Sequence, residues 1–161
     1  QERVEMINDG IVPEGYKQTK VGIIPVEWGV KKLNEITFYQ EGPGVRNYQY
    51  TRSGVKLLNV GNLQDNRLNL NTTDRYISEE EAYGKYKHFL VDEGDLVIAC
   101  SGITEESFNK KIAFAKKEHL PLCMNTSTMR FKTLNKNKLD IRHLFYYLQT
   151  EIFTIQVLRV W

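Results

Sequence analysis

Cysteine and histidine are the residues of this chain with the widest range of possible chemistry, and their spacing supports little of it. Cys100 and Cys123 are separated by 22 residues, with no second cysteine pair and no histidine at ligand spacing. Neither a zinc site nor a disulfide framework is indicated, and both are predicted to be reduced thiols in the core. His88, His119 and His143 are scattered, and no serine or cysteine has an obvious triad partner in the local sequence. Nucleophilic catalysis is therefore not predicted.

The carboxylates and glycines do not follow the spacing of a catalytic or cofactor site either. A metal-dependent nuclease typically carries an Asp followed by an acidic-x-Lys pair on a strand, and no Asp-x-Lys or Glu-x-Lys triplet occurs in this chain. The sequence Gly42-Pro43-Gly44 lacks the third glycine of a dinucleotide-binding loop, and no Gly-Lys-Ser/Thr ending of a P-loop is present. We therefore predict no catalytic residue, no metal and no cofactor.

Several short elements must position whatever site the chain contains. Residues 55–60, 111–115 and 128–132 have strand patterns, and residues 96–100 form an apolar run typical of a strand buried on both faces. A strand is also expected over residues 30–39, interrupted at Asn34 and Glu35. Ser78 and Glu81 form a capping-box pattern, which predicts a short helix over residues 78–88. The stretch 40–54 is a long predicted loop, and loops of that length are usually functional or disordered.

The C-terminal region changes to the period of a helix. Apolar side chains recur there at three- and four-residue steps, which predicts one amphipathic helix of about twenty residues. These side chains are Ile141, Leu144, Phe145, Leu148, Ile152 and Ile155. The predicted fold class is α+β, a single domain with a curved, mostly antiparallel or mixed β-sheet, short helices and this long C-terminal helix. We expect an N-terminal arm over residues 1–22, the domain over residues 23–137 and the helix over residues 138–161.

Composition and charge bound the class of protein. The 161 residues are 41% hydrophobic and 26% charged, as expected of one globular domain. The longest apolar run is far shorter than the roughly 20 residues that cross a bilayer, so we expect a cytoplasmic protein with no membrane partner. The net charge of +2 conceals a division, because residues 1–109 hold 12 basic and 17 acidic side chains and residues 110–161 hold 10 and 3. Such a basic region suits a polyanionic partner or forms a solvated face.

Several phrases, in this order, resemble the target-recognition domain of the specificity (S) subunit of type I restriction-modification systems. The opening phrase combines residues 16–19 (YKQT), 21–25 (VGIIP), Trp28 and Lys32-Leu33. Further phrases are residues 54–63 (GVKLLNVGNL), 76–78 (YIS), 94–97 (GDLV) with Ser101-Gly102 behind them, 125–127 (NTS) and 144–148 (LFYYL). The order of these phrases over residues 16 to about 158 is more specific than any one of them. The chain has one such domain and one helix, where the family generally has two domains separated by long helices.

The resemblance implies a DNA-binding subunit without catalysis of its own. Such a subunit recognises one half of a bipartite target in double-stranded DNA and delivers it to methyltransferase (M) subunits and, through them, to nuclease (R) subunits. A second copy, or a second recognition domain, would be a further partner through the C-terminal helix. Residues 23–137 would then form the DNA target-recognition domain.

Sequence recognition requires side chains that reach base edges, such as Arg for guanine and Asn or Gln for adenine. Three polar stretches offer them: the loop over residues 44–54, the turn over residues 62–67 and the loop over residues 101–111. The first could instead be a surface loop whose tyrosines pack on the sheet, and the second could be a polar turn without a DNA contact. The residues predicted to contact DNA are Arg46, Asn47, Tyr48, Gln49, Tyr50, Arg52, Asn62, Gln64, Arg67, Ser101, Thr104, Asn109, Lys110, Lys111, Asn125, Thr126 and Ser127. Phosphate contacts are predicted for Lys116, Lys117, Lys132 and Lys136.

Three alternatives remain open at the level of sequence. The recognition domain of a fused single-chain restriction-methylation enzyme would carry similar phrases. A nuclease could assemble its acidic site from distant residues, such as Asp92, Asp95 and Glu105. An interaction protein could use the helix over residues 139–159 to pair with another copy or to occupy a methyltransferase subunit.

Overall fold

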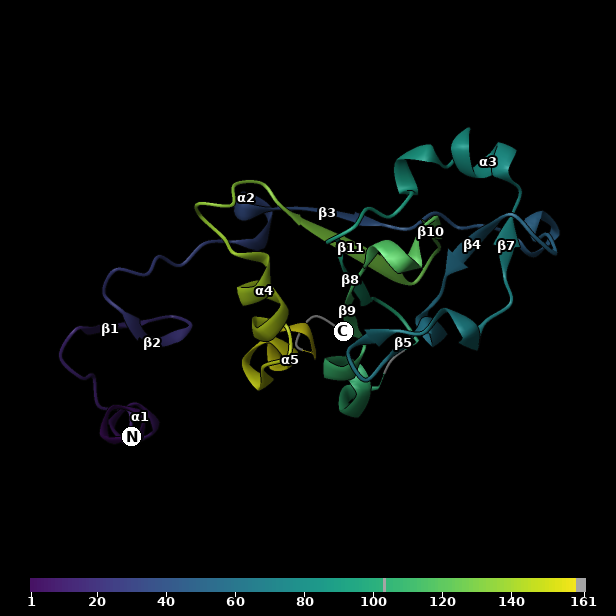
Figure 1. The fold of residues 1–161 in the computed structure, drawn as a ribbon. Helices are drawn as coiled ribbons and strands as arrows, with labels where there is room; N and C mark the ends of the chain where they lie inside the picture. The colour runs from purple at the N-terminus through teal and green to yellow at the C-terminus, as the bar shows by residue number, and fades with distance from the viewer. Residues whose placement is uncertain (103, 159–161) are drawn as a thin grey trace. The chain divides into compact units, whose positions relative to one another are not determined.

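A four-stranded antiparallel sheet is the largest element of the computed structural model, which describes residues 1–102 and 104–158 (Figure 1). Its strands lie in the order β3 (Thr37–Glu41), β11 (Thr128–Thr133), β8 (Leu96–Ala99) and β9 (Ile112–Phe114). All four residues of β8 are buried, as the apolar run predicts for a strand covered on both faces. The predictions for β8, β9 and β11 are thus confirmed within one or two residues.

A second, three-stranded sheet has mixed strand directions. Its central strand β4 (Val55–Leu58) pairs in parallel with β10 (Leu122–Met124) and antiparallel with β7 (Tyr76–Ile77). A separate hairpin joins β5 (Leu63–Gln64) to β6 (Arg67–Leu68), and its two turn residues, Asp65 and Asn66, have positive φ, as a two-residue hairpin turn of type I′ requires. The α+β class is confirmed, with four small sheets in the described residues where one larger sheet was expected.

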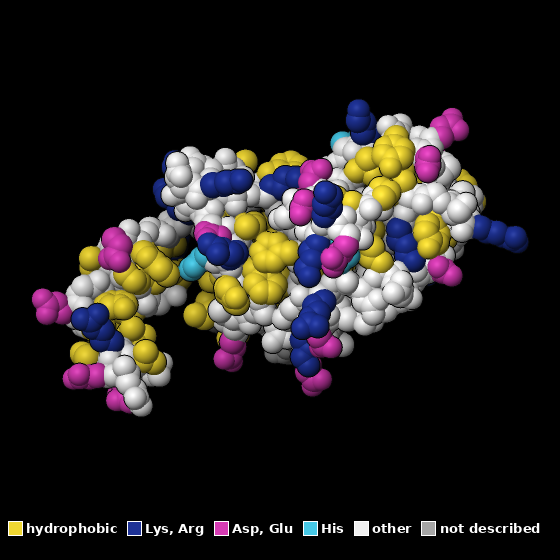
Figure 2. All heavy atoms as spheres, in the orientation of Figure 1, with side chains coloured by type: hydrophobic (Ala, Val, Ile, Leu, Met, Phe, Trp, Pro, Cys, Tyr) yellow, Lys and Arg dark blue, Asp and Glu magenta, His cyan; other side chains and the backbone are white. Residues whose placement is uncertain are grey.

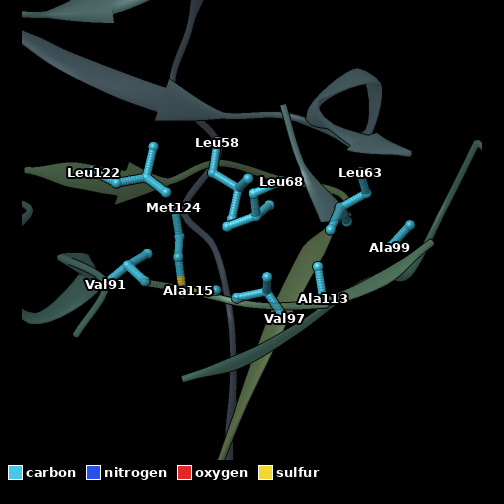
Figure 3. Close-up of a cluster of buried hydrophobic side chains, with 10 residues drawn as sticks. All are labelled: Leu58, Leu63, Leu68, Val91, Val97, Ala99, Ala113, Ala115, Leu122 and Met124. Carbon is cyan, nitrogen blue, oxygen red and sulfur yellow. The ribbon is translucent and has the colours of Figure 1, made fainter. Parts of the chain in front are cut away.

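The core lies between these sheets and the hairpin. One cluster of buried side chains joins Val97, Ala99 and Ala113 of the first sheet, and Ala115 just beyond β9, to Leu58, Leu122 and Met124 of the second (Figure 3). Leu63 and Leu68 of the hairpin complete it. A second cluster lies on the other face of the three-stranded sheet, where α3 (Glu79–Tyr83) and the loop residue Val45 cover Val55, Leu57 and Ile77.

Two short helices replace the long C-terminal helix that the apolar spacing predicts. They are α4 (Ile141–Tyr147) and α5 (Glu151–Leu158), and residues 148–150 separate them. The Thr150 hydroxyl donates to the carbonyl oxygen of Tyr147 at 2.7 Å and accepts from the amide of Phe153 at 3.3 Å. One side chain therefore ends the first helix and begins the second, since hydroxyl side chains compete with helical backbone bonds.

The two C-terminal helices pack on the rest of the domain. The ring of Phe145 in α4 lies 5.1 Å from that of Phe114 in β9, and Phe153 in α5 stacks on Phe108 at 5.8 Å. Asp140 caps α4 by accepting from the amide of Arg142 at 2.8 Å and also pairs with the Arg142 guanidinium. These hydrogen bonds lower the pKa of Asp140 to about 2.

Residues 1–35 and the residues from 36 onward are separately compact. The first unit contains α1 (Glu2–Asn8) and an antiparallel hairpin of β1 (Tyr16–Thr19) and β2 (Gly22–Pro25), so the residues expected to form an arm include regular structure. The strand expected over residues 30–39 is wrong for its first half, because α2 (Leu33–Ile36) forms there and the Glu35 carboxylate accepts from the amide of Lys32 at 3.1 Å.

The remaining helical elements are short 3-10 turns. They are η1 (Asn47–Gln49), η2 (Val60–Asn62), η3 (Leu70–Thr72), η4 (Lys87–Phe89), η5 (Glu105–Lys110) and η6 (Lys117–His119). The helix expected over residues 78–88 is thereby divided into α3 and η4. Its predicted cap is present, since the Ser78 hydroxyl accepts from the amide of Glu81 at 3.2 Å.

Candidate nucleic-acid interface

The register of the four-stranded sheet brings most of the predicted DNA-contacting segments to one end. Glu41 lies opposite Met129, Ala99 opposite Thr128, and Ile98 opposite Ile112. The loops that follow β3 and β8 and precede β9 and β11 therefore all emerge at the same end, which we call the loop end. The described residues 42–54, 100–102, 104–111 and 125–127 belong to these loops.

Backbone hydrogen bonds join these loops to one another. At the loop end, the amide of Gly42 donates to the carbonyl of Thr128 at 2.9 Å, and the amide of Cys100 donates to the carbonyl of Ser127 at 2.9 Å. The hairpin β5–β6 is joined to the same end, because Asn66 donates to the carbonyl of Lys110 at 3.0 Å and Lys111 Nζ donates to that of Leu63 at 2.7 Å. The sequence alone does not predict this connection between the hairpin turn and the loop over residues 101–111.

A pair of buried asparagines fixes the start of the loop over residues 42–54. Asn125 Oδ1 accepts from the amides of Val45 at 3.2 Å and Thr126 at 2.9 Å, while its Nδ2 donates to Asn59 Oδ1 at 3.1 Å. Both asparagines are buried. Gly42 is packed so closely that a Cβ there would lie 2.1 Å from the Asn125 carbonyl oxygen. Asn125 therefore positions the loop, with its polar atoms already bonded inside the protein.

Asn62 also has a positioning role in this structure. Its side chain is fully buried, and its Oδ1 accepts from the amide of Asn59 at 2.8 Å. Its Nδ2 lies 3.1 Å from the carbonyl oxygen of Asn69 and from the hydroxyls of Thr72 and Thr73. These contacts hold the turn that leads into the hairpin, since a buried amide must find its partners within the protein.

The other residues predicted to contact DNA also lie at the loop end, and their side chains are more exposed than those of Asn62 and Asn125. Those classed as exposed are Arg46, Asn47, Tyr48, Arg52, Gln64, Arg67, Thr104, Asn109, Lys110 and Thr126, and those partly buried are Gln49, Tyr50, Ser101, Lys111 and Ser127. No carboxylate among the described side chains forms an ion pair with Arg46, Arg52, Arg67 or Lys110. The loop end therefore presents cations, amides and hydroxyls to the solvent.

Arg75 is a further cation that the sequence does not single out. Its guanidinium lies 5.5 Å from the centre of the Tyr50 ring, and its Nη1 lies 3.5 Å from Asn59 Oδ1. The pairing of β4 with β7 places Arg75 there, because Leu57 donates to the Arg75 carbonyl at 2.9 Å. This pairing joins residues 18 positions apart, and the local sequence around Arg75 gives no signal of it.

The opposite end of the four-stranded sheet is built from ion pairs, and we call it the ion-pair end. The buried guanidinium of Arg130 donates to Asp95 Oδ2 at 3.0 Å, to Gln40 Oε1 at 2.8 Å and to the carbonyls of Leu90 at 2.7 Å and His88 at 2.9 Å. Asp95 is also buried, so this network satisfies charges that would otherwise be costly to bury.

Lys132 belongs to the same network. It contacts both Asp95 and Asp92, the latter at 2.6 Å. Burial tends to lower the pKa of Lys132, but hydrogen bonds to the two carboxylates outweigh it and raise the pKa. Lys116 lies beyond β9 at this end and approaches Glu118 at 3.8 Å. The predicted phosphate contacts of Lys116, Lys117 and Lys132 thus lie at the other end of the sheet from the predicted base contacts.

The backbone positions of the acidic residues considered for a nuclease site lie at opposite ends of β8, and the side chain of Glu105 is outside the described part of the structure. Asp92 and Asp95 precede β8, whereas Glu105 follows it in η5. Asp95 is bound to Arg130 and Lys132. Within the described residues, no group of three or more His, Cys, Asp or Glu side chains could hold a metal ion.

The two cysteines are free thiols. Cys123 is buried as predicted, and its burial raises its pKa to about 12. Cys100 is only partly buried, which differs from the predicted core position. Burial, followed by the nearby Glu41 carboxylate, raises the pKa of Cys100 to about 11.

Similarity to known proteins bears directly on this arrangement. No family model matches the chain. The type I restriction enzyme MjaVIII specificity subunit of Methanocaldococcus jannaschii is 27% identical over 140 residues, which cover 87% of this chain and 32% of that protein. The resemblance to a specificity subunit is thereby confirmed. The chain spans about a third of the length of this curated relative.

A solved structure supports the fold. A chain from a study of complex assembly and conformational transition in the type I R-M system aligns with a TM-score of 0.51 and 14% identity. The alignment covers 85% of this chain and 28% of that one.

In the part of the chain that the structure describes, no helix is long and apolar enough to cross a membrane.

Proposed function

We propose that this chain is a DNA-recognition domain of a type I specificity subunit and that it recognises one half of a bipartite target in double-stranded DNA. The observation that carries the proposal is the loop end, where hydrogen bonds join three loops and a hairpin that present cations without ion-pair partners among the described side chains. The similarity to a specificity subunit supports the same function.

Under this proposal the exposed residues of the loop end contact DNA. Arg46, Arg52 and Arg67 carry the donor pattern that suits guanine, and Asn47 and Asn109 carry the pattern that suits adenine. Lys110 and Arg75 supply phosphate contacts, which fix the orientation of the domain on the duplex. Thr126 and Thr104 are hydroxyl donors and acceptors that suit either base type.

The buried residues have a different role in the proposal. Asn62 and Asn125 have their side-chain amides engaged within the protein, so we assign them to positioning the loops. The division between exposed contacting residues and buried positioning residues replaces the single set of contacts that the sequence indicates.

Partner subunits complete the proposed function. We propose that methyltransferase subunits, and through them nuclease subunits, perform the chemistry, with none performed by this chain. The recognising part falls within residues 23–137, and the C-terminal helices contribute to assembly with a second recognition domain or a second copy. Tyr146, Ile152 and Ile155 of these helices are exposed apolar side chains available for such contacts.

The test is selection from a randomised duplex pool by the full chain in complex with a methyltransferase subunit. We expect an enriched sequence whose binding weakens steeply with added salt. Arg46→Ala should relax the preference at one position by about 1–3 kcal/mol. Lys117→Ala, which removes an exposed cation from the ion-pair end, is the matched control and should leave the preference unchanged. A pool without enrichment, or equal effects of the two variants, would contradict the proposal.

A further inference from the structure

Tyr48 is the most exposed of the large hydrophobic side chains in the described part of the chain. It occupies the middle of the turn η1, and 87% of its surface is accessible to solvent. Arg46 and Arg52, both exposed, lie on either side of it in the sequence. An aromatic ring in this position can stack on a flat partner without first leaving a contact within the protein.

The turn that carries Tyr48 is held rigidly by its neighbour Gln49. Gln49 Nε2 donates to Glu81 Oε1 at 2.6 Å and to the Tyr86 hydroxyl at 3.0 Å, and Gln49 Oε1 accepts from the Arg46 amide at 2.9 Å. Both amide hydrogens and one oxygen lone pair are therefore used. Gln49 has too little free capacity to bind an adenine through two hydrogen bonds.

The two flanks of the turn are fixed as well. Val45 is buried, and its amide is bound by Asn125. On the other side, the amide of Thr51 donates to the carbonyl of Tyr76 at 2.9 Å. A side chain presented from a backbone fixed at three points loses little conformational freedom on binding, which favours affinity.

We infer that the Tyr48 ring stacks on a nucleobase of the bound duplex by entering an opened base step, and that Gln49 is the residue that positions it. The inference rests on the proposed function and specifies how one residue of the loop end acts. Side chains inserted between base steps unstack them locally, and base stacking on aromatic rings does not depend on charge. Arg46 and Arg52 contact the adjacent phosphates or base edges.

The experiment uses the selected duplex and the full chain in complex with a methyltransferase subunit. Tyr48→Ala should weaken binding roughly 5- to 150-fold, the range that corresponds to the loss of one base stack. Its salt dependence should match that of the unaltered protein, because no charge is removed. Tyr48→Phe, which lacks only the hydroxyl, should bind like the unaltered protein, whereas a role through hydroxyl hydrogen bonding would make it resemble Tyr48→Ala.

The opened base step has its own signal. In a series of duplexes, 2-aminopurine replaces one adenine at a time. On binding, its fluorescence should increase at one position, at or next to the opened base step. Tyr48→Ala should remove that increase. Tyr83→Ala is the matched control, because Tyr83 is an exposed tyrosine on the neighbouring helix α3, and it should retain both binding and brightening.

The outcomes separate this inference from the proposed function. If the unaltered protein selects a sequence but Tyr48→Ala binds it equally well, the stacking role is wrong and the proposed function stands. If no sequence is selected at all, the proposed function fails and the stacking role falls with it. Because Tyr48 is exposed, its replacement should leave thermal unfolding unchanged, and this measurement excludes a folding defect as the cause of lost binding.

The positioning role of Gln49 is tested by a double-mutant cycle. Gln49→Ala should weaken DNA binding and reduce the 2-aminopurine signal when Tyr48 is present. In the Tyr48→Ala background, the same change should weaken binding far less, because there is no ring left to position. Strictly additive losses would overturn the positioning role.

Discussion

The two ends of the four-stranded sheet both carry cations but use them differently. At the ion-pair end, Arg130 and Lys132 are bound to Asp95 and Asp92. At the loop end, Arg46 and Arg52 have no ion-pair partner among the described side chains. A cation bound to a carboxylate belongs to a structural network, whereas an exposed cation without such a partner is available to a polyanion.

One face of the molecule illustrates the same point. Figure 2 shows Lys and Arg side chains interspersed with Asp and Glu over the visible face, without a single large basic area. The small net charge of +2 is consistent with this mixture. A recognition surface on such a protein is therefore better identified by which cations are unpaired than by net charge.

The largest expected effect comes from breaking the ion-pair end. Arg130→Ala leaves the carbonyls of Leu90 and His88 without this donor and takes one of its two cations from the buried Asp95 carboxylate, which keeps Lys132, so the free energy of unfolding should fall by about 3–5 kcal/mol. Urea denaturation measures it. Arg52→Ala at the loop end is the control, and its unfolding free energy should change by less than about 0.5 kcal/mol. Similar losses in the two variants would remove the distinction between the ends.

A smaller effect is expected from a single methyl group at the loop end. Gly42→Ala places a Cβ 2.1 Å from the Asn125 carbonyl oxygen, and the backbone must shift at a cost of about 1–3 kcal/mol. Gly44→Ala, two residues along the same loop, meets no atom within 4 Å and has no positive φ, so it should be neutral. Thermal unfolding compares the two. DNA selectivity should fall in the first variant only, and a neutral Gly42→Ala would show that the buried asparagines do not fix this loop.

The smallest expected effect concerns the reactivity of Cys100 at the loop end. Because its pKa is raised to about 11, the reactive thiolate is scarce at pH 9 and its alkylation rate should keep rising until about pH 11. Glu41→Gln removes the second cause of the shift but leaves burial, so the rate at pH 9 should increase only modestly. Mass spectrometry of iodoacetamide-treated protein follows both cysteines. Cys123, with a pKa of about 12, serves as the internal control, and a rate at Cys100 that levels off near pH 9 would contradict the prediction.

The local sequence pattern predicts those strands whose faces are each consistently buried or exposed. The apolar run at β8 and the alternation at β9 and β11 are sufficient, because burial on one or both faces sets the side-chain pattern of a strand. The parallel pairing of β10 with β4 is not predictable in this way, since it joins residues more than 60 positions apart. In the C-terminal region the sequence pattern predicts too much, namely one long helix. The apolar spacing continues through Thr150, although the Thr150 hydroxyl interrupts the helix.

Residue type predicts which side chains could contact DNA, but not which of them are already bonded within the protein. Residue type identifies Asn62, Asn125 and Gln49 as possible base contacts, yet all three amides are engaged within the protein. An asparagine that contacts a base and one that holds a loop have the same chemistry, and only burial separates them. Lys132 illustrates the same limit, because its carboxylate partners lie 37 and 40 residues away in the chain.

The hydrogen bonds between the loops have one further consequence. Main-chain groups and buried amides fix the positions of these loops, so the identities of their exposed side chains contribute little to folding. Positions such as Arg46, Asn47 and Arg52 are therefore free to vary at almost no cost in stability. Under the proposed function, a lineage could acquire a new DNA target through a few surface substitutions while the framework that presents them stays the same.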